Sequence, residues 1–336
     1  MNKAPMKILF IKLTILSTLI SVSSNNWIGV WMGLKINLLS FIPLITYNKG
    51  LNSNIKGIKY FIVQSISSVV LLTSAIMMLI NDMFNIDFIL SLMAMSILMK
   101  MGAAPLHFWF PEIMENLEWN NCLILMTWQK FAPMIILSYI KINLNLINLC
   151  ILMSAFIGAI MGLNQISLRS ILAYSSINHL GWMISAIYSN SIIWMIYFST
   201  YILIITLITM SFKSNNLFTI KEIYYNKNYN KISKINLSLS FLSLGGMPPF
   251  IGFLPKWLLI EEMMNMSQYT VITMLIISST ITLYFYMKMF MSAMLILSQE
   301  NKWYLNNFNG KHTEKLALSL NMLSNLGLLI SSTILF

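Results

Sequence analysis

Long apolar runs separated by short polar linkers dominate the chain. A helix that crosses a bilayer needs about 20 predominantly apolar residues, and runs of that length recur from one end of the sequence to the other. The sequence is therefore predicted to be an all-α polytopic membrane protein with about eleven transmembrane helices. The predicted spans are 4–22, 26–46, 58–80, 86–106, 121–140, 144–164, 169–188, 191–212, 235–262, 270–297 and 316–336, with a polar, basic loop at 213–234.

Glycine and proline interrupt two of these spans. One ends in KMGAAPLHFWFP, from Lys100 to Pro111, and another contains GGMPPFIGFLPKW, from Gly245 to Trp257. Proline removes a backbone donor and clashes with the preceding turn, so both spans are predicted to be discontinuous helices. The predicted helix-break residues are Gly102, Pro105, Gly245, Gly246, Pro248, Pro249 and Pro255.

The two interruptions also suggest an internal repeat. Irregular backbone at membrane depth is tolerated only inside protein or beside water, and paired interrupted spans in two halves of a chain indicate an inverted repeat. The spacing predicts two inverted five-helix units in a single membrane domain, with Lys100 and Lys256 at corresponding breaks. The units are 1–140 and 144–297, and an additional C-terminal helix follows at 316–336.

Composition supports a membrane protein and argues against nucleic-acid binding. The 336 residues are 57% hydrophobic and only 9% charged, whereas soluble domains carry about 25% charged residues. The net charge of +11 comes from lysines in short loops and in spans, not from a basic face with stacking aromatics. The predicted outside loops hold essentially Lys141, and the other loop cations fall inside, so the positive-inside rule places the N-terminus inside and the C-terminus outside.

The sequence lacks the residues that metal sites, iron–sulfur clusters, common cofactor sites and catalytic triads require. Two cysteines, Cys122 and Cys150, cannot hold an iron–sulfur cluster that needs four ligands, and the three histidines lack metal-ligand spacing. The sequence contains no phosphate loop, dinucleotide fingerprint, flavin site or catalytic triad. We therefore predict that the chain itself binds no metal, no cofactor and no small-molecule substrate. Abundant methionine beside a single arginine is typical of AT-biased coding, which is common in organelle genomes.

The candidate chemistry lies in four lysines inside apolar runs: Lys35, Lys100, Lys130 and Lys256. Each costs roughly 2.5–3.5 kcal/mol at the bilayer centre on insertion scales, so a purely structural chain would carry leucine there. Desolvation disfavours the charged form of a lysine, which suits these groups to loading and releasing protons. We predict a proton relay through these lysines.

Other polar residues in the spans complete the candidate set. His179 is deep in its span and suits either a relay or a packing role, and His107 suits a relay or a hydrogen-bonding role beside the break. Lys288 lies near the end of a span, where a lysine can also snorkel to the interface. The hydroxyl and amide groups that could connect them are Ser96, Thr127, Gln129, Ser175, Ser176, Asn178 and Ser243.

Several segments resemble a known family. WQKFAP, GAAPLHFWFPE, SSINHLGWM and LSLGGMPPFIGFLPKW are similar to the mitochondrially encoded chain 2 family of NADH:ubiquinone oxidoreductase, respiratory complex I. WMGLKINLLSFIPL resembles its shortened, insect-type members. The resemblance implies antiporter-like inverted units and a role in proton translocation driven by NADH oxidation elsewhere in the complex.

The resemblance also assigns roles and partners. It implies that Lys100 and Lys256 are the lysines of the two broken helices, that Lys130 links the two half-channels, and that His179 lies in a family motif. FMN, iron–sulfur clusters and ubiquinone are expected in partner subunits, and the neighbours are expected to be other membrane-arm subunits, including antiporter-like chains, and lipids. The location implied is the mitochondrial inner membrane, with the N-terminus on the matrix side and the C-terminus on the intermembrane-space side.

Lys35 departs from the family pattern, which usually has a glutamate paired with the lysine at Lys100. A lysine would repel Lys100 instead. Three hypotheses follow. The first is that the two lysines are kept apart, the second is that a neighbouring subunit supplies the acid, and the third is that the unit works with neutral lysines. We favour the second hypothesis, because a lone pair of ammonium groups is the costliest arrangement.

Two other functions remain open from the sequence. A stand-alone cation/proton antiporter of related fold would need an acidic cation site at depth, and the predicted spans carry lysines there instead. A structural spacer in the membrane arm would need none of the intramembrane lysines to titrate.

Overall fold

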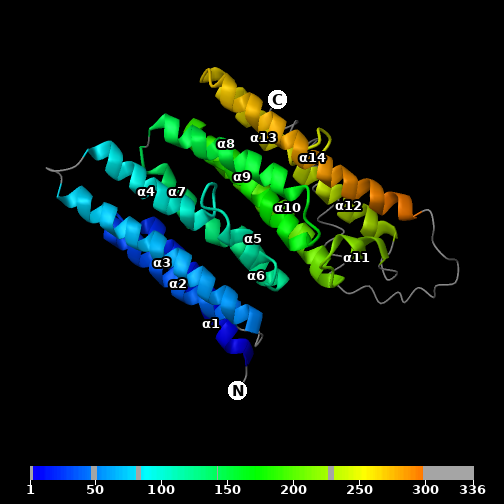
Figure 1. Ribbon diagram of the computed structural model, residues 1–336, viewed down its shortest axis with the longest axis horizontal. Helices are drawn as coiled ribbons and strands as arrows, with labels where there is room; N and C mark the ends of the chain where they lie inside the picture. The colour runs from blue at the N-terminus through cyan, green and yellow to red at the C-terminus, as the bar shows by residue number, and fades with distance from the viewer. Residues whose placement is uncertain (1–2, 47–50, 81–84, 142, 226–230, 298–336) are drawn as a thin grey trace. The chain divides into compact units, whose positions relative to one another are not determined.

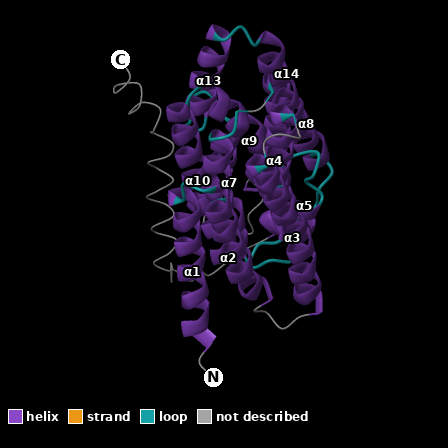
Figure 2. Ribbon diagram, turned by 90° about the vertical axis from the view of Figure 1, so that its left-hand side faces the viewer, coloured by secondary structure: helices purple, strands orange, loops and turns teal. Residues whose placement is uncertain are grey.

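The computed structural model describes residues 3–46, 51–80, 85–141, 143–225 and 231–297. In these ranges the regular structure is helical, apart from an isolated antiparallel bridge between Ser167 and Thr219 (Figure 2). The predicted all-α class is confirmed. The chain divides into two compact units, Met1–Ser154 and Ala155–Phe336, and the boundary falls inside a helix.

The first unit brings helices together in sequence order (Figure 1). The first helix packs against the second, the second against the third, and the third against the fourth. Three short helices follow the interruption after the fourth helix, and two of them pack back on earlier ones: the fifth helix on the third, and the seventh on the fourth and the first. The helices are α1 (Lys3–Ser23), α2 (Trp27–Thr46), α3 (Leu51–Leu79), α4 (Ile86–Met101), α5 (Trp109–Met114), α6 (Trp119–Met126), α7 (Trp128–Ser138) and the first part of α8 (Leu144–Gly162).

The second unit is built around its second helix, α9. Helices α10, α13 and α14 all pack against α9, and α12 packs between α10 and α14. The helices after α8 are α9 (Leu168–Ser189), α10 (Ser191–Ser214), α11 (Ile220–Tyr225), α12 (Lys231–Gly245), α13 (Phe253–Asn265) and α14 (Tyr269–Leu297).

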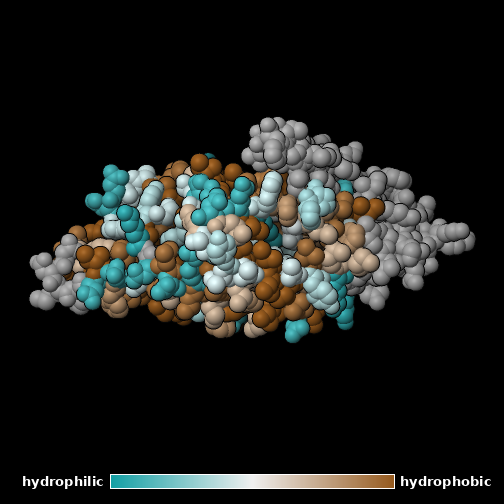
Figure 3. Space-filling view, turned by 90° about the horizontal axis from the view of Figure 1, so that it is seen from above, coloured by the Kyte–Doolittle hydropathy of each residue, from teal (hydrophilic) through white to brown (hydrophobic). Residues whose placement is uncertain are grey.

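Long apolar helices make the protein a multi-pass membrane protein. Among the described residues, six helices are long and apolar enough to cross a bilayer on their own, namely α1, α2, α3, α8, α10 and α14. Many large apolar side chains on them are exposed, including Leu39, Ile62 and Ile160, as a lipid-facing surface requires. Figure 3 shows such apolar residues interspersed with hydrophilic ones on one face.

Helix α9 is long but too polar to belong to that group. It carries Ser175, Ser176, Asn178 and His179 at its centre, and all four side chains are buried. Because α9 is surrounded by protein, its polar groups find partners there and need not meet lipid. A hydrophobicity criterion therefore misses the helix on which the second unit is built.

Most predicted spans coincide with helices, but three do not run through. The span predicted at 121–140 is divided at Thr127 (φ −111°, ψ −72°), where the backbone N–H and the hydroxyl both bond the Leu123 carbonyl, at 3.0 and 2.7 Å. The predicted spans 86–106 and 235–262 end or divide at their breaks, after Met101 and Gly245. The number of spans therefore stays a prediction.

Two other predicted segments also need comment. The loop predicted at 213–234 contains the short helix α11, whose first turn is organised by Glu222: its Oε2 accepts hydrogen bonds from the N–H groups of Phe218 and Thr219. The helix predicted at 316–336 lies outside the described residues. The inverted relation between the two units also stays a prediction.

Close helix packing in the second unit depends on Gly158. A Cβ atom added there would lie 2.5 Å from the backbone nitrogen of Asn178 and 2.7 Å from the carbonyl oxygen of Tyr174, so α8 and α9 are in backbone contact. The Asn178 amide then donates to the Ala155 carbonyl at 2.9 Å. At Gly162 the nearest atom to such a Cβ is a Phe285 ring carbon at 3.2 Å, which leaves slightly more room.

Two acidic residues of the α5–α6 segment form ion pairs within the first unit. Glu112 pairs with Lys59 at 2.6 Å, and Glu118 pairs with Lys7 at 3.2 Å. The hydrogen bond from Lys59 lowers the pKa of Glu112 below its usual value. These acids therefore fasten the segment after the first break to α3 and α1.

We predict that Gly158→Ala destabilises the protein more than Gly162→Ala. At Gly158 the added methyl group meets backbone atoms that cannot move independently, so overpacking should cost about 1–3 kcal/mol. The measurement is the midpoint of heat-induced unfolding in mild detergent. Equal shifts for the two variants would show that the α8–α9 contact is not as tight as described.

We predict that Glu112→Gln lowers stability slightly at neutral pH. The Glu112 side chain is 51% exposed, so its pair with Lys59 should contribute about 0.2–1 kcal/mol. Because the folded-state pKa of Glu112 is lowered, this contribution is fully present above the unfolded-state value of about 4.3 and is lost as the pH falls through the folded-state pKa. Melting curves of both proteins should thus differ at pH 7 and converge at strongly acid pH.

Candidate functional site

Lys100 lies in the last turn of α4, directly before the first break, and its side chain is 7% exposed. Gly102 ends the helix in the left-handed conformation (φ 75°). The last carbonyl groups of a helix have no partner within the helix, and here other groups supply one. The Gln64 amide donates to the Lys100 carbonyl at 3.2 Å, and the Trp109 indole donates to the Met99 carbonyl at 3.2 Å.

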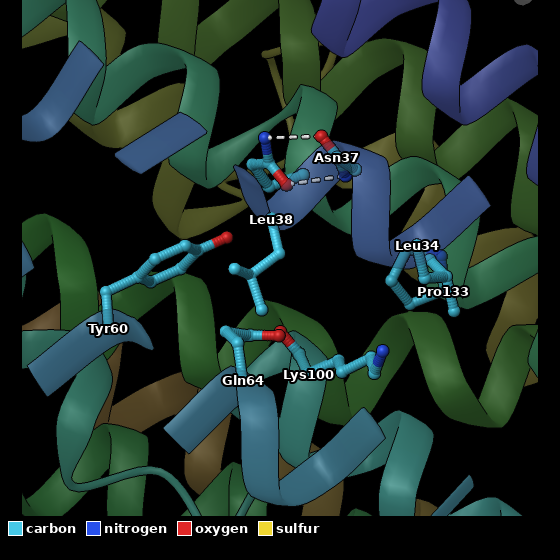
Figure 4. Close-up of a pocket in the computed structure, with 8 residues that line it drawn as sticks. Leu34, Asn37, Leu38, Tyr60, Gln64, Lys100 and Pro133 are labelled. Carbon is cyan, nitrogen blue, oxygen red and sulfur yellow. Dashed lines mark hydrogen bonds between the residues drawn. The ribbon is translucent and has the colours of Figure 1, made fainter. Parts of the chain in front are cut away.

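A small polar pocket adjoins Lys100 (Figure 4). Asn37 on α2 and Gln129 on α7 form a reciprocal amide pair at its edge, with distances of 2.8 and 3.0 Å. Tyr60 and Gln64 on α3 complete the polar lining. The cavity volume of about 20 Å³ accommodates the centre of one water molecule.

Lys35 lies on α2 at the edge of this region. Its side chain is half-buried, with the ammonium nitrogen 6.0 Å from the centre of the Trp31 ring. Lys35 and Lys100 are close enough for their charges to repel. Within the described residues, neither lysine forms an ion pair with a carboxylate.

Lys130 is the most buried of the four lysines, at 1% exposure. It lies in the first turn of α7, three residues after the division at Thr127, and its ammonium nitrogen is 5.0 Å from the centre of the Phe110 ring. Pro133, in the next turn, has no N–H for the Gln129 carbonyl, so the helix is irregular on both sides of Lys130.

Lys256 follows the second break and lies in the first turn of α13, whereas Lys100 precedes the first break. Its ammonium group donates a 2.9 Å hydrogen bond to the carbonyl of Gly245, the last residue of α12. The nitrogen is 5.6 Å from the centre of the Trp182 ring. Because the carboxyl end of a helix carries partial negative charge, the end of α12 stabilises the cation at 5% exposure.

The glycines of the second break keep the backbone close to Lys256. Gly246 adopts φ +81°, and a Cβ atom there would lie 3.0 Å from the Lys256 nitrogen. A Cβ atom on Gly252 would overlap the Ser243 carbonyl oxygen. Pro255, predicted to break the helix, instead lies in the first turn of α13, where its missing N–H costs nothing.

His179 is buried among tyrosines in the second unit. Its Nδ1 is 2.9 Å from the Tyr197 hydroxyl, and its ring centre is 5.3 Å from that of Tyr201. A cavity of about 10 Å³, near the size of one water site, is lined by His179 and by residues of the second break, Gly252 and Pro255.

The remaining candidates lie apart from these groups. His107 is buried after the first break, with Nδ1 3.2 Å from the Pro105 carbonyl oxygen, and its Nε2 has no partner among the described residues. Lys288 is exposed on α14. The structure thus places Lys35 within electrostatic range of Lys100, and places His179 and the second break, which carries Lys256, at one cavity.

Several polar residues of these sites were not identified from the sequence. Asn37, Tyr60 and Gln64 line the Lys100 pocket, and Tyr197 and Tyr201 line the His179 cavity. An asparagine or glutamine inside an apolar run is a usable signal, whereas tyrosines are too common in such runs to be selected. No group of three His, Cys, Asp or Glu side chains with metal-binding geometry occurs among the described residues.

Comparison with known proteins shows which family the chain belongs to. A family model described as NADH:quinone oxidoreductase/Mrp antiporter, transmembrane, matches residues 24–282. NADH-ubiquinone oxidoreductase chain 2 of Anopheles gambiae is 44% identical over 336 residues, which cover 97% of both chains. The chain belongs to the NADH-ubiquinone oxidoreductase chain 2 family. Other members of this chain 2 family are those of Locusta migratoria, at 44% identity over 97% of this chain and 96% of that one, and Bos taurus, at 36% over 87% of each.

Solved structures show that the fold is shared more widely than the chain 2 family. A chain of respiratory complex I from Thermus thermophilus with bound aureothin superposes with a TM-score of 0.85 at 20% identity, covering 97% of this chain and 78% of that one. A chain of the Mrp complex from Dietzia sp. superposes with a TM-score of 0.78 at 13% identity, covering 97% and 75%. At these identities the likeness concerns the fold alone.

Proposed function

We propose that this chain is a proton-translocating membrane-arm subunit of NADH:ubiquinone oxidoreductase in the mitochondrial inner membrane. The observation that carries the proposal is the burial of Lys100, Lys130 and Lys256, each at or beside an irregular point in a helix. Membership of the chain 2 family supports the assignment to this enzyme. Electron transfer, with FMN, iron–sulfur clusters and ubiquinone, belongs to partner subunits.

The geometry suits stepwise proton transfer between amines. A desolvated lysine is less costly when neutral, and polar groups lie at two of the three buried lysines, Lys100 and Lys256. At Lys256 that group is the Gly245 carbonyl, which accepts a hydrogen bond from the amine in either protonation state. Near Lys100 the amides of Asn37 and Gln129 hold a pocket large enough for water.

The orientation proposed has the N-terminus on the matrix side and the C-terminus on the intermembrane-space side. The distribution of loop lysines supports it. The proposed partners are other membrane-arm subunits, among them antiporter-like chains, together with lipids that cover the exposed apolar helices. The residue usage, with many methionines and one arginine, fits an organelle gene.

A stand-alone cation/proton antiporter is less well supported. Such a carrier needs an acidic group at membrane depth to bind the cation, and the buried charged side chains among the described residues are Lys100, Lys130 and Lys256. A structural spacer would not explain why three desolvated lysines are retained at an insertion cost of roughly 2.5–3.5 kcal/mol each.

We also propose that a partner subunit supplies a carboxylate near Lys35. Two neighbouring cations at membrane depth are costly, and the described residues pair neither with an acid. Lys35 is the half-buried member of the two, at the boundary between the core side of α2 and its exposed side, which carries Met32, Ile36 and Leu39. A helix with a buried Asp or Glu packed on this side would neutralise the pair.

We predict that Lys130→Met and Lys256→Met each reduce NADH-driven proton pumping at least about tenfold, since proton-transfer groups contribute about 10²–10⁴-fold. Pumping is measured on the purified complex in liposomes with a pH-sensitive dye. A native gel stained for NADH dehydrogenase activity establishes that each variant assembles. The control is Lys141→Met, which removes an exposed loop lysine. Assembled variants that pump normally would support the structural-spacer function instead.

We predict that a membrane-permeant carbodiimide joins Lys35 or Lys100 to an Asp or Glu of a partner chain. The reagent links an amine to a carboxylate only when the two are paired, and the cross-linked peptide is identified by mass spectrometry of the intact complex. The Lys35→Met, Lys100→Met double variant should lose the product. Two results together would contradict the partner-carboxylate proposal. The wild-type complex would give no such cross-link, and the Lys35→Glu variant would pump as well as wild type.

A further inference from the structure

One side of α9 carries three residues at consecutive three-residue intervals, Ser176, His179 and Trp182. Residues spaced three apart lie on the same face of a helix. Two of them contact groups of neighbouring helices. His179 Nδ1 lies 2.9 Å from the Tyr197 hydroxyl of α10, and the Trp182 ring centre lies 5.6 Å from the Lys256 nitrogen of α13.

The hydrogen bonds of this face differ in how far their direction is fixed. Ser176 donates its hydroxyl proton to the Ala173 carbonyl of its own helix at 2.7 Å, and a carbonyl can only accept. The Tyr197 hydroxyl has no such constraint: it donates to Nδ1 when the imidazole is neutral there, and accepts when Nδ1 carries a proton. Tyr197 can therefore follow the protonation state of His179, whereas Tyr201 contacts the imidazole ring to ring, with the ring centres 5.3 Å apart.

Other titratable groups near His179 come from three helices. Tyr197 and Tyr201 are on α10, Lys256 is on α13, and Tyr286 on α14 is close to both tyrosines. The part of α8 that lies in this unit, 155–162, contains no titratable side chain. Among these groups, Tyr197 is the one whose hydroxyl contacts a ring nitrogen of His179 in the described structure.

We propose that Tyr197 is the positioning residue of His179, and that its hydroxyl decides which ring nitrogen exchanges protons with the cavity at the α12–α13 break. With Nδ1 held by Tyr197, exchange proceeds through Nε2. A water in the cavity, which His179, Gly252 and Pro255 line, then connects the ring to the break that carries Lys256. This inference rests on the proposed function and names a residue that its proton path requires.

The test compares two tyrosine variants that each remove one hydroxyl from the same cavity. In Tyr197→Phe the protonated imidazole loses its acceptor, and because hydrogen bonds of charged groups are about twice as strong as neutral ones, the protonated form is disfavoured. Pumping by the complex in liposomes should fall several-fold, and its half-maximal point on the acid side should move to lower pH by about half a unit or more. Tyr201→Phe should lower the rate without moving the profile, and Tyr284→Phe, an exposed change on α14, should alter neither.

Three outcomes would overturn the inference. The profile of assembled Tyr197→Phe could coincide with that of wild type, or Tyr201→Phe could move it equally. His179→Gln, which tests the same path without altering Tyr197, could leave pumping and its pH profile unchanged.

The Lys256→Met variant separates this inference from the proposed function. If the Lys256→Met complex pumps normally, the proposed function fails. If that complex is inactive and the Tyr197→Phe complex pumps normally, only the role of Tyr197 fails.

Discussion

The structure depends on satisfying the backbone groups that two helix breaks release. In a bilayer no water is available for a free carbonyl, so an interrupted helix is stable only where protein provides donors. The first break is satisfied by Gln64 and Trp109, which donate to carbonyls at the end of α4. The second break is satisfied in part by Lys256 itself, which donates to the end of α12. In the second unit, the candidate proton carrier itself therefore stabilises the break. In the first unit, residues other than Lys100 stabilise it.

This difference has consequences for the lysines. Lys100 is free to change its hydrogen bonding without loosening α4, because other side chains hold the helix end. Lys256 holds the carbonyl of Gly245 in either protonation state, but a move of its side chain would leave that carbonyl without the 2.9 Å bond. Any motion that accompanies proton transfer in the second unit should therefore involve the segment 246–252, whose glycines lie against Lys256 and Ser243.

The polar character of α9 follows from its place inside the second unit. Its serines bond carbonyls of α9 itself, Asn178 donates to the Ala155 carbonyl of α8, and His179 contacts the Tyr197 hydroxyl of α10. Its apolar neighbours α8, α10 and α14 can face lipid because α9 does not. Gly158 makes this possible at close range, since the backbones of α8 and α9 meet there without an intervening side chain.

The sequence alone determined the membrane class, the position of most helices and the place of both breaks, because these follow from apolar run length and from the chemistry of glycine and proline. It also identified Lys100, Lys130 and Lys256, since a charge in an apolar run is costly wherever the run folds. It could not reveal that Asn37 and Gln129 meet, because they lie far apart in the chain, nor that Thr127 divides a helix and Pro255 begins one, because threonine and proline are compatible with more than one local backbone conformation. Only the tertiary structure decided that the hydroxyl of Tyr197 meets a ring nitrogen of His179, whereas Tyr201 meets the imidazole with its ring. A tyrosine in a span has the same local pattern whether it faces lipid or a histidine, and packing alone separates the two.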